Sequence, residues 1–413
     1  CFNFAINMCN GNGECRKLEK GTMCPSYQAS LDEYETTRAR ATALQAIIKG
    51  ETPAADLTNQ ELYDVLKHCL QCKGCQSDCP SEVDMAKLKS EVLYHYHSKH
   101  GFPLRSKIFA NIDKLNALGS KTPGLATWFQ GTGLAKWILS QVGIAPERKL
   151  PPFAKQRFSE WLRQQQQNGE YPNGEVVLFI DTYMEFNYPE LGIDTLKVCN
   201  ALGIKVVTAG YSCCGRPAIS KGLLPQAKER ARKLVAALYP HAREGQTIIG
   251  LEPSCILTIR DEYKSLVPGK ETLAVAEACK TIDEYLAEVI ARKGIIFPSR
   301  PDIQIPVFLH GHCHQKAISG TSPTLQVLRA VKGFEVQEIN SGCCGMAGTF
   351  GYEKENYAFS QQVGETRLFP AIRELPHHAE LVADGLSCRS QIEHGTTHAA
   401  QHLIQLLAKY LNT

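Results

Sequence analysis

From residue 175 onward, short apolar runs alternate with longer amphipathic stretches. Each short run has the length of a buried strand, and each longer stretch repeats its apolar residues with the spacing of a helix. Strands that alternate with helices predict parallel sheets. The expected strands lie at 175–180, 204–209, 246–251, 334–339 and 379–384 and in the segment 305–314, and the expected helices lie near 190–203, 226–239, 324–333 and 355–369.

This pattern occurs twice. The motifs "YSCCGRP" and "EPSC" of the first copy correspond to "SGCCGMAG" and "GLSC" of the second. Cys213 and Cys343 are 130 residues apart, and Cys255 and Cys388 are 133 apart. We therefore expect two similar α/β domains that face each other across a pseudo-two-fold axis, with cysteines at the ends of their parallel strands. The expected bounds are 171–300 and 301–413.

The first 100 residues have helical periodicity instead. The stretch 30–50 predicts a helix that Gly50 ends, and the stretch 81–101 predicts another, with Ser81 and Asp84 suited to its first turn. We expect an α-helical domain over 1–100.

A helical connector is expected over 101–170, and the polar stretch 163–175 marks its boundary with the first α/β domain. Trp128 and Trp137 lie in this connector. They could form a contact surface for a membrane or a partner, but we expect two packed helices that bury both tryptophans.

Composition narrows the function classes. The chain has 413 residues, enough for two to four domains, and 43% of them are hydrophobic, as in ordinary globular proteins. A net charge of +3 gives no support for nucleic-acid binding. No apolar run is long enough to span a membrane and no signal peptide is visible, so we expect a cytoplasmic protein, with any membrane contact made from the surface. The chain begins with Cys1 rather than methionine, so we expect it to be a piece of a longer protein.

Seventeen cysteines, most of them clustered, predict metal sites in a reduced compartment rather than disulfides. Cys69, Cys72, Cys75 and Cys79, followed by Pro80, have the C-x2-C-x2-C-x3-C-P spacing of bacterial ferredoxins. In that run three thiolates hold one [4Fe–4S] cluster and the fourth cysteine ligates another. Zinc knuckles would leave the fourth spacing and the proline unexplained.

Because the fourth cysteine of such a run ligates another cluster, a second group of cysteines is needed, and it lies upstream. Cys9 and Cys15 are six residues apart, with Asn12 in the middle place, and Cys24 precedes a proline. One cluster is then expected on Cys69, Cys72, Cys75 and Cys24, and the other on Cys9, Cys15 and Cys79. The second set lacks one thiolate, so three alternatives stay open: a [3Fe–4S] cluster, a cube with a non-cysteine ligand, or closure by Cys1.

The two α/β repeats supply a third set of cysteines. The second repeat offers four, Cys313, Cys343, Cys344 and Cys388, whereas the first offers three, Cys213, Cys214 and Cys255, because Met184 aligns with Cys313. We expect a third iron–sulfur cluster here, with zinc or packed thiols without metal as alternatives. We expect local hydrogen bonding rather than metal ligation for the neighbouring His310, His312 and His314. Cys199 and Cys279, which stand alone, are expected to be buried hydrophobes.

These motifs carry a family likeness. "CLQCKGCQSDCP", "SCCGRP", "GCCGMAGTFGYEKENY" and "DGLSCRSQI" resemble the iron–sulfur part of FAD-linked D-2-hydroxyacid dehydrogenases. That group includes glycolate oxidase iron–sulfur subunits, the anaerobic glycerol-3-phosphate dehydrogenase C subunit, and fused D-lactate or D-2-hydroxyglutarate dehydrogenases. The likeness covers nearly the whole chain and is weakest over 101–170. The sequence departs from the family pattern at two positions. Asn12 stands where the first motif would have a cysteine, and Met184 stands where the second repeat has Cys313.

The resemblance implies a function. A flavin on a missing domain or a partner subunit would oxidise a D-2-hydroxyacid, and the clusters would pass its electrons singly to a quinone or another acceptor. The sequence has no glycine-rich dinucleotide fingerprint after a strand and no evident acid–base pair, so we expect an electron-transfer module without the substrate site. Two alternatives are a heterodisulfide reductase-like protein, whose cluster needs five thiolates, and a non-redox protein in which zinc ties the domains together.

Overall fold

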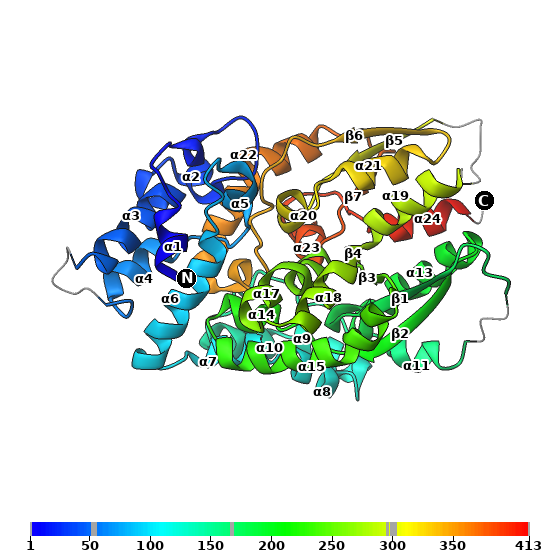
Figure 1. Cartoon of the computed structure of the whole chain (residues 1–413), viewed down its shortest axis with the longest axis horizontal. Helices are drawn as coiled ribbons and strands as arrows, with labels where there is room; N and C mark the ends of the chain where they lie inside the picture. Colours follow the sequence, from blue (N-terminus) through cyan, green and yellow to red (C-terminus); the bar gives the residue numbers. More distant parts are fainter. Residues whose placement is uncertain (1, 51–55, 166–168, 295–296, 298–303, 412–413) are drawn as a thin grey trace.

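A computed structural model describes residues 2–50, 56–165, 169–294, 297 and 304–411. The molecule has an all-helical N-terminal part at one end of its long axis, and two α/β repeats that lie one above the other beside it (Figure 1). This is the expected fold class, an α-helical ferredoxin-like domain followed by two repeated α/β domains with parallel sheets.

The N-terminal part is built from helices around one apolar cluster that includes most of its cysteines. Asp78 ties the two cysteine-bearing segments together, because one of its carboxylate oxygens accepts from the backbone N–H groups of Thr22 (2.6 Å) and Met23 (2.9 Å). The Asp84 side chain caps the last helix, as its position in the sequence predicts. The helices are α1 (Phe2–Asn7), α2 (Pro25–Ser30), α3 (Thr37–Ile48), α4 (Gln60–Leu66), α5 (Gly74–Asp78) and α6 (Met85–His100).

The connector is built from short helices, and it departs from the sequence prediction in one respect. Trp128 and Trp137 are 67% and 61% exposed, so the expectation that packed helices bury them is wrong. The two helices that carry them contact each other, but that contact leaves both indole rings on the outside. The connector helices are α7 (Leu104–Ala110), α8 (Ile112–Gly119), α9 (Pro123–Gly131), α10 (Gly133–Gln141) and α11 (Phe158–Leu162).

The first repeat is a four-stranded parallel sheet in the order β2-β1-β3-β4. Its strands are β1 (Glu175–Ile180), β2 (Lys205–Tyr211), β3 (Ile248–Gly250) and β4 (Cys279–Thr281). Cys199 and Cys279 are buried as expected, although Cys279 begins a strand rather than lying in a helix. The helices are α12 (Thr182–Phe186), α13 (Pro189–Ala201), α14 (Arg216–Ser220), α15 (Leu224–Arg243), α16 (Pro253–Leu257), α17 (Tyr263–Leu266), α18 (Lys270–Ala278) and α19 (Ile282–Lys293), and a π-helical turn, η3 (Thr258–Glu262), joins α16 to α17.

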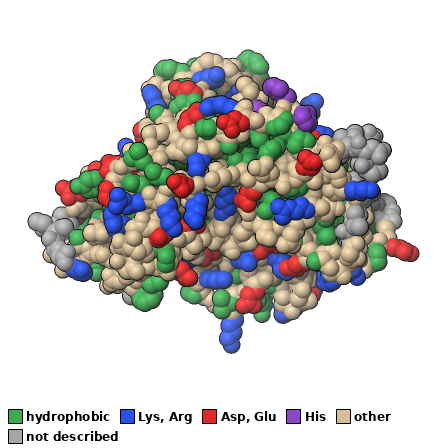
Figure 2. Space-filling model, turned by 90° about the horizontal axis from the view of Figure 1, so that it is seen from above, with side chains coloured by type: hydrophobic (Ala, Val, Ile, Leu, Met, Phe, Trp, Pro, Cys, Tyr) green, Lys and Arg blue, Asp and Glu red, His purple; other side chains and the backbone are tan. Residues whose placement is uncertain are grey.

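The second repeat is a three-stranded parallel sheet in the order β6-β5-β7. Its strands are β5 (Ile305–Leu309), β6 (Phe334–Glu338) and β7 (Glu380–Val382), and its helices are α20 (Cys313–Ile318), α21 (Ser322–Arg329), α22 (Tyr357–Arg373), α23 (Leu386–Gly395) and α24 (Leu403–Leu411). Helix α13 packs against α24 and α19 against α21, so one hydrophobic core runs through both repeats. On the face seen in Figure 2, acidic and basic side chains are interspersed.

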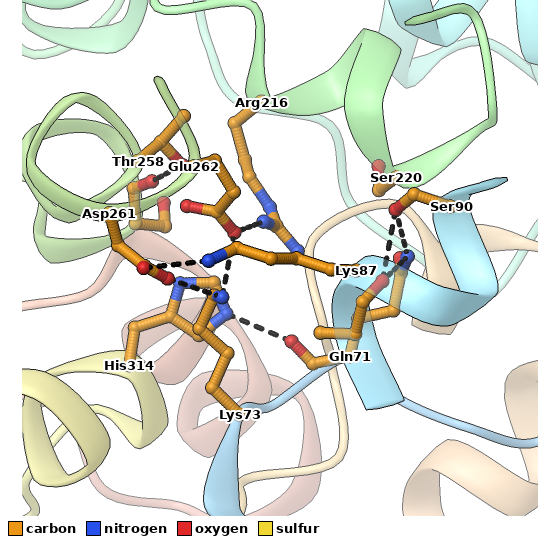
Figure 3. A network of polar contacts seen from close by, with 12 residues as sticks. Gln71, Lys73, Lys87, Ser90, Arg216, Ser220, Thr258, Asp261, Glu262 and His314 are labelled. Atoms are coloured by element: carbon orange, nitrogen blue, oxygen red, sulfur yellow. Dashed lines mark hydrogen bonds and ion pairs between the residues drawn. The ribbon is translucent and has the colours of Figure 1, made fainter. Parts of the chain in front are cut away.

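A buried ion-pair network joins the N-terminal part to the first repeat (Figure 3). The Lys73 ammonium group is fully buried and lies 2.6 Å from Asp261, 3.1 Å from Asp84 and 3.2 Å from Glu262. Lys87 also binds Asp261, at 2.8 Å, and Arg216 binds Glu262. Burial disfavours the charge of Lys73, but the three carboxylates outweigh burial and raise the pKa of Lys73. Since Lys73 lies between Cys72 and Cys75, the network holds a cysteine loop against η3.

We expect Lys73→Met to lower the free energy of unfolding by about 3 kcal/mol, because it leaves buried carboxylates without one of their cations. Urea unfolding followed by circular dichroism measures this change. Lys99→Met is the matched control, since Lys99 is exposed and pairs with an exposed Asp56, and it should change the unfolding free energy by less than about 0.5 kcal/mol. Equal effects of the two variants would contradict a stabilising role for the network.

The network also predicts a pH dependence. Burial raises the pKa of Asp261. The charges of Lys73 and Lys87 outweigh burial and bring this pKa from its ordinary 3.8 down to about 2. A carboxyl whose pKa is lower in the folded state stabilises the fold fully above its ordinary pKa and loses this effect as pH falls toward 2. Asp261→Asn should therefore be less stable than the unmodified chain by about 2 kcal/mol at pH 5. This difference should shrink between pH 4 and pH 2, and a gap independent of pH would contradict the assignment.

Candidate metal centres

Four of the N-terminal thiols surround one small cavity. Cys24, Cys69, Cys72 and Cys75 all line it, and each is buried. The sequence groups the same four residues on the exchange rule of the ferredoxin run. Cys24 lies just before α2, whereas the other three lie in the loop between α4 and α5 or at the start of α5. A buried cavity walled by four thiols fits a [4Fe–4S] cluster, which the thiolates would hold at its four iron atoms.

The loop that carries these thiols has an uncommon backbone. Gln71 and Lys73 have φ values of +51° and +61°, which non-glycine residues adopt rarely. The Gln71 side chain donates to Ser90 Oγ (2.9 Å) and the Lys73 side chain binds the acidic network, so both conformations are held from outside the loop. The surrounding structure therefore fixes how Cys72, between them, points into the cavity.

Two buried cations lie beside this cavity. Arg40 is 0% exposed and its Nη1 donates to Cys24 Sγ at 3.4 Å. Lys89 donates to the carbonyl oxygens of Cys69 (2.7 Å) and Lys67 (3.0 Å), and burial lowers the pKa of Lys89 to about 8. Helical periodicity alone would leave Arg40 on a solvated helix face. In the structure its charge instead acts directly on the thiols.

The second N-terminal set is less complete. Cys15 and Cys79 are buried and Cys9 is half-buried, and all three pack in or against one apolar cluster. Asn12 is exposed and its side-chain oxygen accepts from the N–H of Glu14, so a local hydrogen bond stands in the place where the motif would have a thiol. Cys1, the other candidate ligand, lies outside the described residues. A cluster on this set stays a prediction, either as a [3Fe–4S] cluster or as a [4Fe–4S] cluster with a further ligand.

The second repeat gathers the thiols of its CCG and GLSC motifs beside a histidine. Cys343 and Cys344 follow β6, Cys388 lies in α23, and Cys313 begins α20. Thiol contacts from Cys343 and Cys388 outweigh burial and lower the pKa of Cys344. The ligand atoms of His310, Cys344 and Cys388 lie within 4.8 Å of one another. The donor set therefore fits an iron–sulfur cluster, and it also fits zinc.

His310 is the site residue that sequence reasoning placed in a lesser role. Its Nδ1 lies 2.6 Å from Ser341 Oγ, a local hydrogen bond of the kind expected, but its buried Nε2 has no hydrogen-bond partner among the described residues and faces the thiols. Of its neighbours, His312 bonds locally as expected, since its Nδ1 accepts from the N–H of His314. His314 does not: its Nε2 lies 2.9 Å from the carbonyl oxygen of Gln71 in the N-terminal part, and its buried Nδ1 has no hydrogen-bond partner among the described residues. A polar atom that is buried and unpaired beside two thiols points to a ligand at that position.

The first repeat does not assemble an equivalent set. Its Cys214 and Cys255 lie with their Sγ atoms 3.1 Å apart, and Cys213 accepts a hydrogen bond from Arg230 Nη1 at 3.7 Å. The buried Met184 occupies the place that Cys313 has in the second repeat. Among the described residues, three ligand atoms within 4.8 Å of one another are found in the second repeat and not in the first.

The cluster sites of the N-terminal part and of the second repeat are neighbours. Cys72 packs in one apolar cluster with Cys313 and Cys343, together with Leu70 and Phe350. A charge on Cys313 is close enough to raise the pKa of Cys72, after burial itself. The thiols of two separate sequence motifs therefore meet across the boundary between the parts, and clusters bound at the two sites would be neighbours.

A cavity of about 190 Å³ opens beside the second-repeat thiols. Cys255, Cys313 and Cys344 line it from the two repeats, and Ile112 and Gln130 line it from the connector. Its wall is mainly apolar, with Glu252, His312 and Arg216 among the polar groups. Such a composition is typical of a site for a small organic molecule.

Comparisons with known proteins agree with this geometry. Residues 5–83 match the family model described as a 4Fe-4S dicluster domain, and residues 179–260 and 307–393 match the cysteine-rich (CCG) domain. D-2-hydroxyglutarate dehydrogenase of Pantoea ananatis is 25% identical over 97% of this chain. The anaerobic glycerol-3-phosphate dehydrogenase C subunit of Escherichia coli is 29% identical over 86% of this chain and 89% of its own length. The chain belongs to the iron–sulfur, CCG-repeat part of the FAD-linked dehydrogenases.

This iron–sulfur CCG protein has other relatives too. Lactate utilization protein A 1 of Bacillus mycoides is 26% identical over 47% of the chain and 79% of its own length. The chain spans only 43% of the Pantoea relative, so it corresponds to less than half of a D-2-hydroxyglutarate dehydrogenase. Since its relatives include dehydrogenases and their subunits, the CCG protein is an oxidoreductase component.

We expect Arg40→Met to lower the reduction potential of one N-terminal cluster of the CCG protein by about 50–100 mV. A buried positive charge stabilises the added electron, and its loss is worth on the order of 1–2 kcal/mol. Potentiometric titration followed by electron paramagnetic resonance measures the shift. Arg16→Met is the control, because the Arg16 side chain is 52% exposed. An unchanged potential in Arg40→Met would show that Arg40 only supports the fold.

Proposed function

We propose that this chain is the electron-transfer module of a flavin-dependent dehydrogenase and carries three iron–sulfur clusters. The first is assigned to Cys24, Cys69, Cys72 and Cys75, and the second to Cys9, Cys15 and Cys79. The third is assigned to Cys313, Cys343, Cys344 and Cys388, with His310 beside it. When bound, the clusters supply one-electron redox steps. The chain's own residues hold the thiolates, exclude water from them and place cations beside them.

One observation carries the proposal, the packing of Cys72 against Cys313 and Cys343. Sites in three sequence segments then form one series, from Cys9 and Cys15 near the N-terminus, through the cavity of Cys72, to the second repeat. A structural zinc protein has no need for neighbouring metal sites across a domain boundary. A heterodisulfide reductase-like function finds no support either, since neither repeat gathers five thiols among the described residues.

The relatives suggest the substrate and the partner. Two are named as dehydrogenases of D-2-hydroxyglutarate and glycerol 3-phosphate, and a third for lactate utilization. We propose that electrons come from a reduced flavin that has oxidised a D-2-hydroxyacid such as lactate, glycolate or 2-hydroxyglutarate. This flavin would lie on a domain or subunit outside the chain. We further propose that the protein works in the cytoplasm and delivers electrons to a quinone or another acceptor.

The cavity of about 190 Å³ is the proposed place for that acceptor. It lies at the end of the series, with Cys313 and Cys344 in its wall, and the apolar lining suits a ring system better than an ion. The N–H groups of His312 and Arg216, both in its wall, could donate to the oxygen atoms of a carbonyl-bearing acceptor. The electron path would then run from the flavin partner, through the N-terminal clusters, to a molecule held between the repeats.

Iron analysis of cysteine variants tests the proposal. After anaerobic purification, we expect inorganic sulfide and a paramagnetic signal after reduction with dithionite. Cys72→Ser and Cys388→Ser should each lose about four iron atoms per chain, the content of one [4Fe–4S] cluster. Cys199→Ser is the matched control, because Cys199 is equally buried but stands alone in α13, and it should keep all its iron.

Two outcomes contradict parts of the proposal. Stoichiometric zinc without sulfide would contradict the electron-transfer function as a whole. Full iron content in Cys388→Ser, together with loss in Cys72→Ser, would leave the N-terminal clusters in place and remove the third cluster from the assignment.

A further inference from the structure

The connector exposes an unusual amount of apolar surface. Among the described residues, eight of the fourteen large hydrophobic side chains reported as exposed belong to α8, α9 and α10. We call this surface the α8–α10 face, and it consists of Leu115, Leu118, Leu125, Trp128, Phe129, Leu134, Trp137 and Ile138. Exposed patches of this kind usually mark a contact with a protein or a membrane.

The helices that form this face are held together as one unit. The backbone N–H of Phe153 donates to Thr127 Oγ1 on α9 (3.0 Å), and its ring lies against Gly119 at the end of α8. Helix α10 packs against α9. The face is therefore a built surface, and its exposed side chains do not come from a loosely attached segment.

The exposed charges on the helices of the α8–α10 face have one sign. Lys114, Lys121 and Lys136 are exposed on α8–α10 or between them. Over residues 104–141 the single acidic residue is Asp113, and its carboxylate binds Arg230 of the first repeat at 2.8 Å. The apolar side chains are thus accompanied by exposed cations, and the same segment adds no exposed carboxylate beside them. This combination is complementary to a surface that is apolar inside and anionic outside.

Helix length excludes a spanning segment. Helices α9 and α10 have nine residues each, less than half of what a bilayer requires. No described helix is long and apolar enough to cross a membrane. Tryptophan is the residue that prefers the boundary between headgroups and acyl chains, and lysine binds anionic headgroups. Short helices with both features lie in the plane of the membrane surface.

We propose that the α8–α10 face docks on the surface of an anionic lipid bilayer. The leucines, tryptophans and Phe129 would enter the headgroup boundary, and the three lysines would bind lipid phosphates. The docking itself needs no cluster and no flavin.

One consequence rests on the proposed function. Ile112 and Asn116 of α8 and Gln130 of α9 line the cavity beside the second-repeat thiols. The helices that would contact lipid therefore also form a wall of the proposed acceptor site. A lipid-soluble acceptor is the class that this arrangement favours over a water-soluble one.

Vesicle flotation of the purified full chain tests the docking. We expect binding to vesicles of phosphatidylethanolamine and phosphatidylglycerol, weaker binding to phosphatidylcholine alone, and a decrease with added salt. Trp128→Ser/Trp137→Ser should weaken binding at least about tenfold. Leu31→Ser/Leu273→Ser is the matched control, because both leucines are exposed on other helices or their ends, and it should bind as well as the unmodified chain.

Several results would overturn the docking. They are no binding of the unmodified chain to anionic vesicles, equal binding of the tryptophan variant, or a tryptophan-dependent dimer or flavin-partner complex in size-exclusion chromatography without vesicle binding. Circular dichroism and iron content of the tryptophan variant should be unchanged, since both residues are exposed. Loss of iron in the cysteine variants concerns the proposed function alone, so the two proposals can fail separately.

Discussion

The structure depends on the way a charged cysteine loop is held between two domains. Lys73 lies between two of the clustered thiols and is fully buried, yet it remains charged because Asp84, Asp261 and Glu262 surround it. A buried cation of this kind is stable only with its partners in place, so the contact between the loop and η3 has little freedom to slide. The same contact fixes where Cys72 lies, and Cys72 in turn lies against the thiols of the second repeat. One group of ion pairs therefore sets both the packing of the domains and the position of the thiols on the proposed electron path.

The hydrophobic core that the two repeats share fixes the position of one repeat relative to the other. Apolar side chains of both sheets belong to one cluster, and helices α13 and α24 pack against each other across the boundary between the repeats. Each repeat places its cysteines after the ends of parallel strands, where loops converge on the region between the sheets. The N-terminal part then covers this region from one side and the connector from another. The result is a cavity whose wall contains residues from all parts of the chain.

Much of this arrangement could be predicted from the sequence, for local reasons. The alternation of strands and helices, the CCG duplication and the ferredoxin spacing are short-range patterns, and the exchange rule even grouped Cys24 with Cys69, Cys72 and Cys75, which line one cavity. The failures concern long-range packing. The periodicity around Arg40 does not reveal that its guanidinium lies beside Cys24. The apolar pattern around Trp128 and Trp137 is the same for a buried helix pair and for an exposed one. His310 stood among three similar histidines, and only the fold shows that its ring lies within 4.8 Å of the thiols of Cys344 and Cys388.

The two repeats have unequal donor sets. "FIDTYM" in the first repeat stands where "FLHGHC" stands in the second, so Asp181 and Met184 replace His310 and Cys313. The first repeat has the incomplete set of thiols. It also contributes Asp261, Glu262 and Arg216 to the buried ion-pair network that holds the cysteine loop. The two repeats thus differ in role: the second holds the thiols of the proposed third cluster, and the first holds the cysteine loop in place. In the proposed function, this asymmetry places one metal site beside the N-terminal thiols instead of two equivalent ones, so a pair of similar repeats would offer electrons a single route.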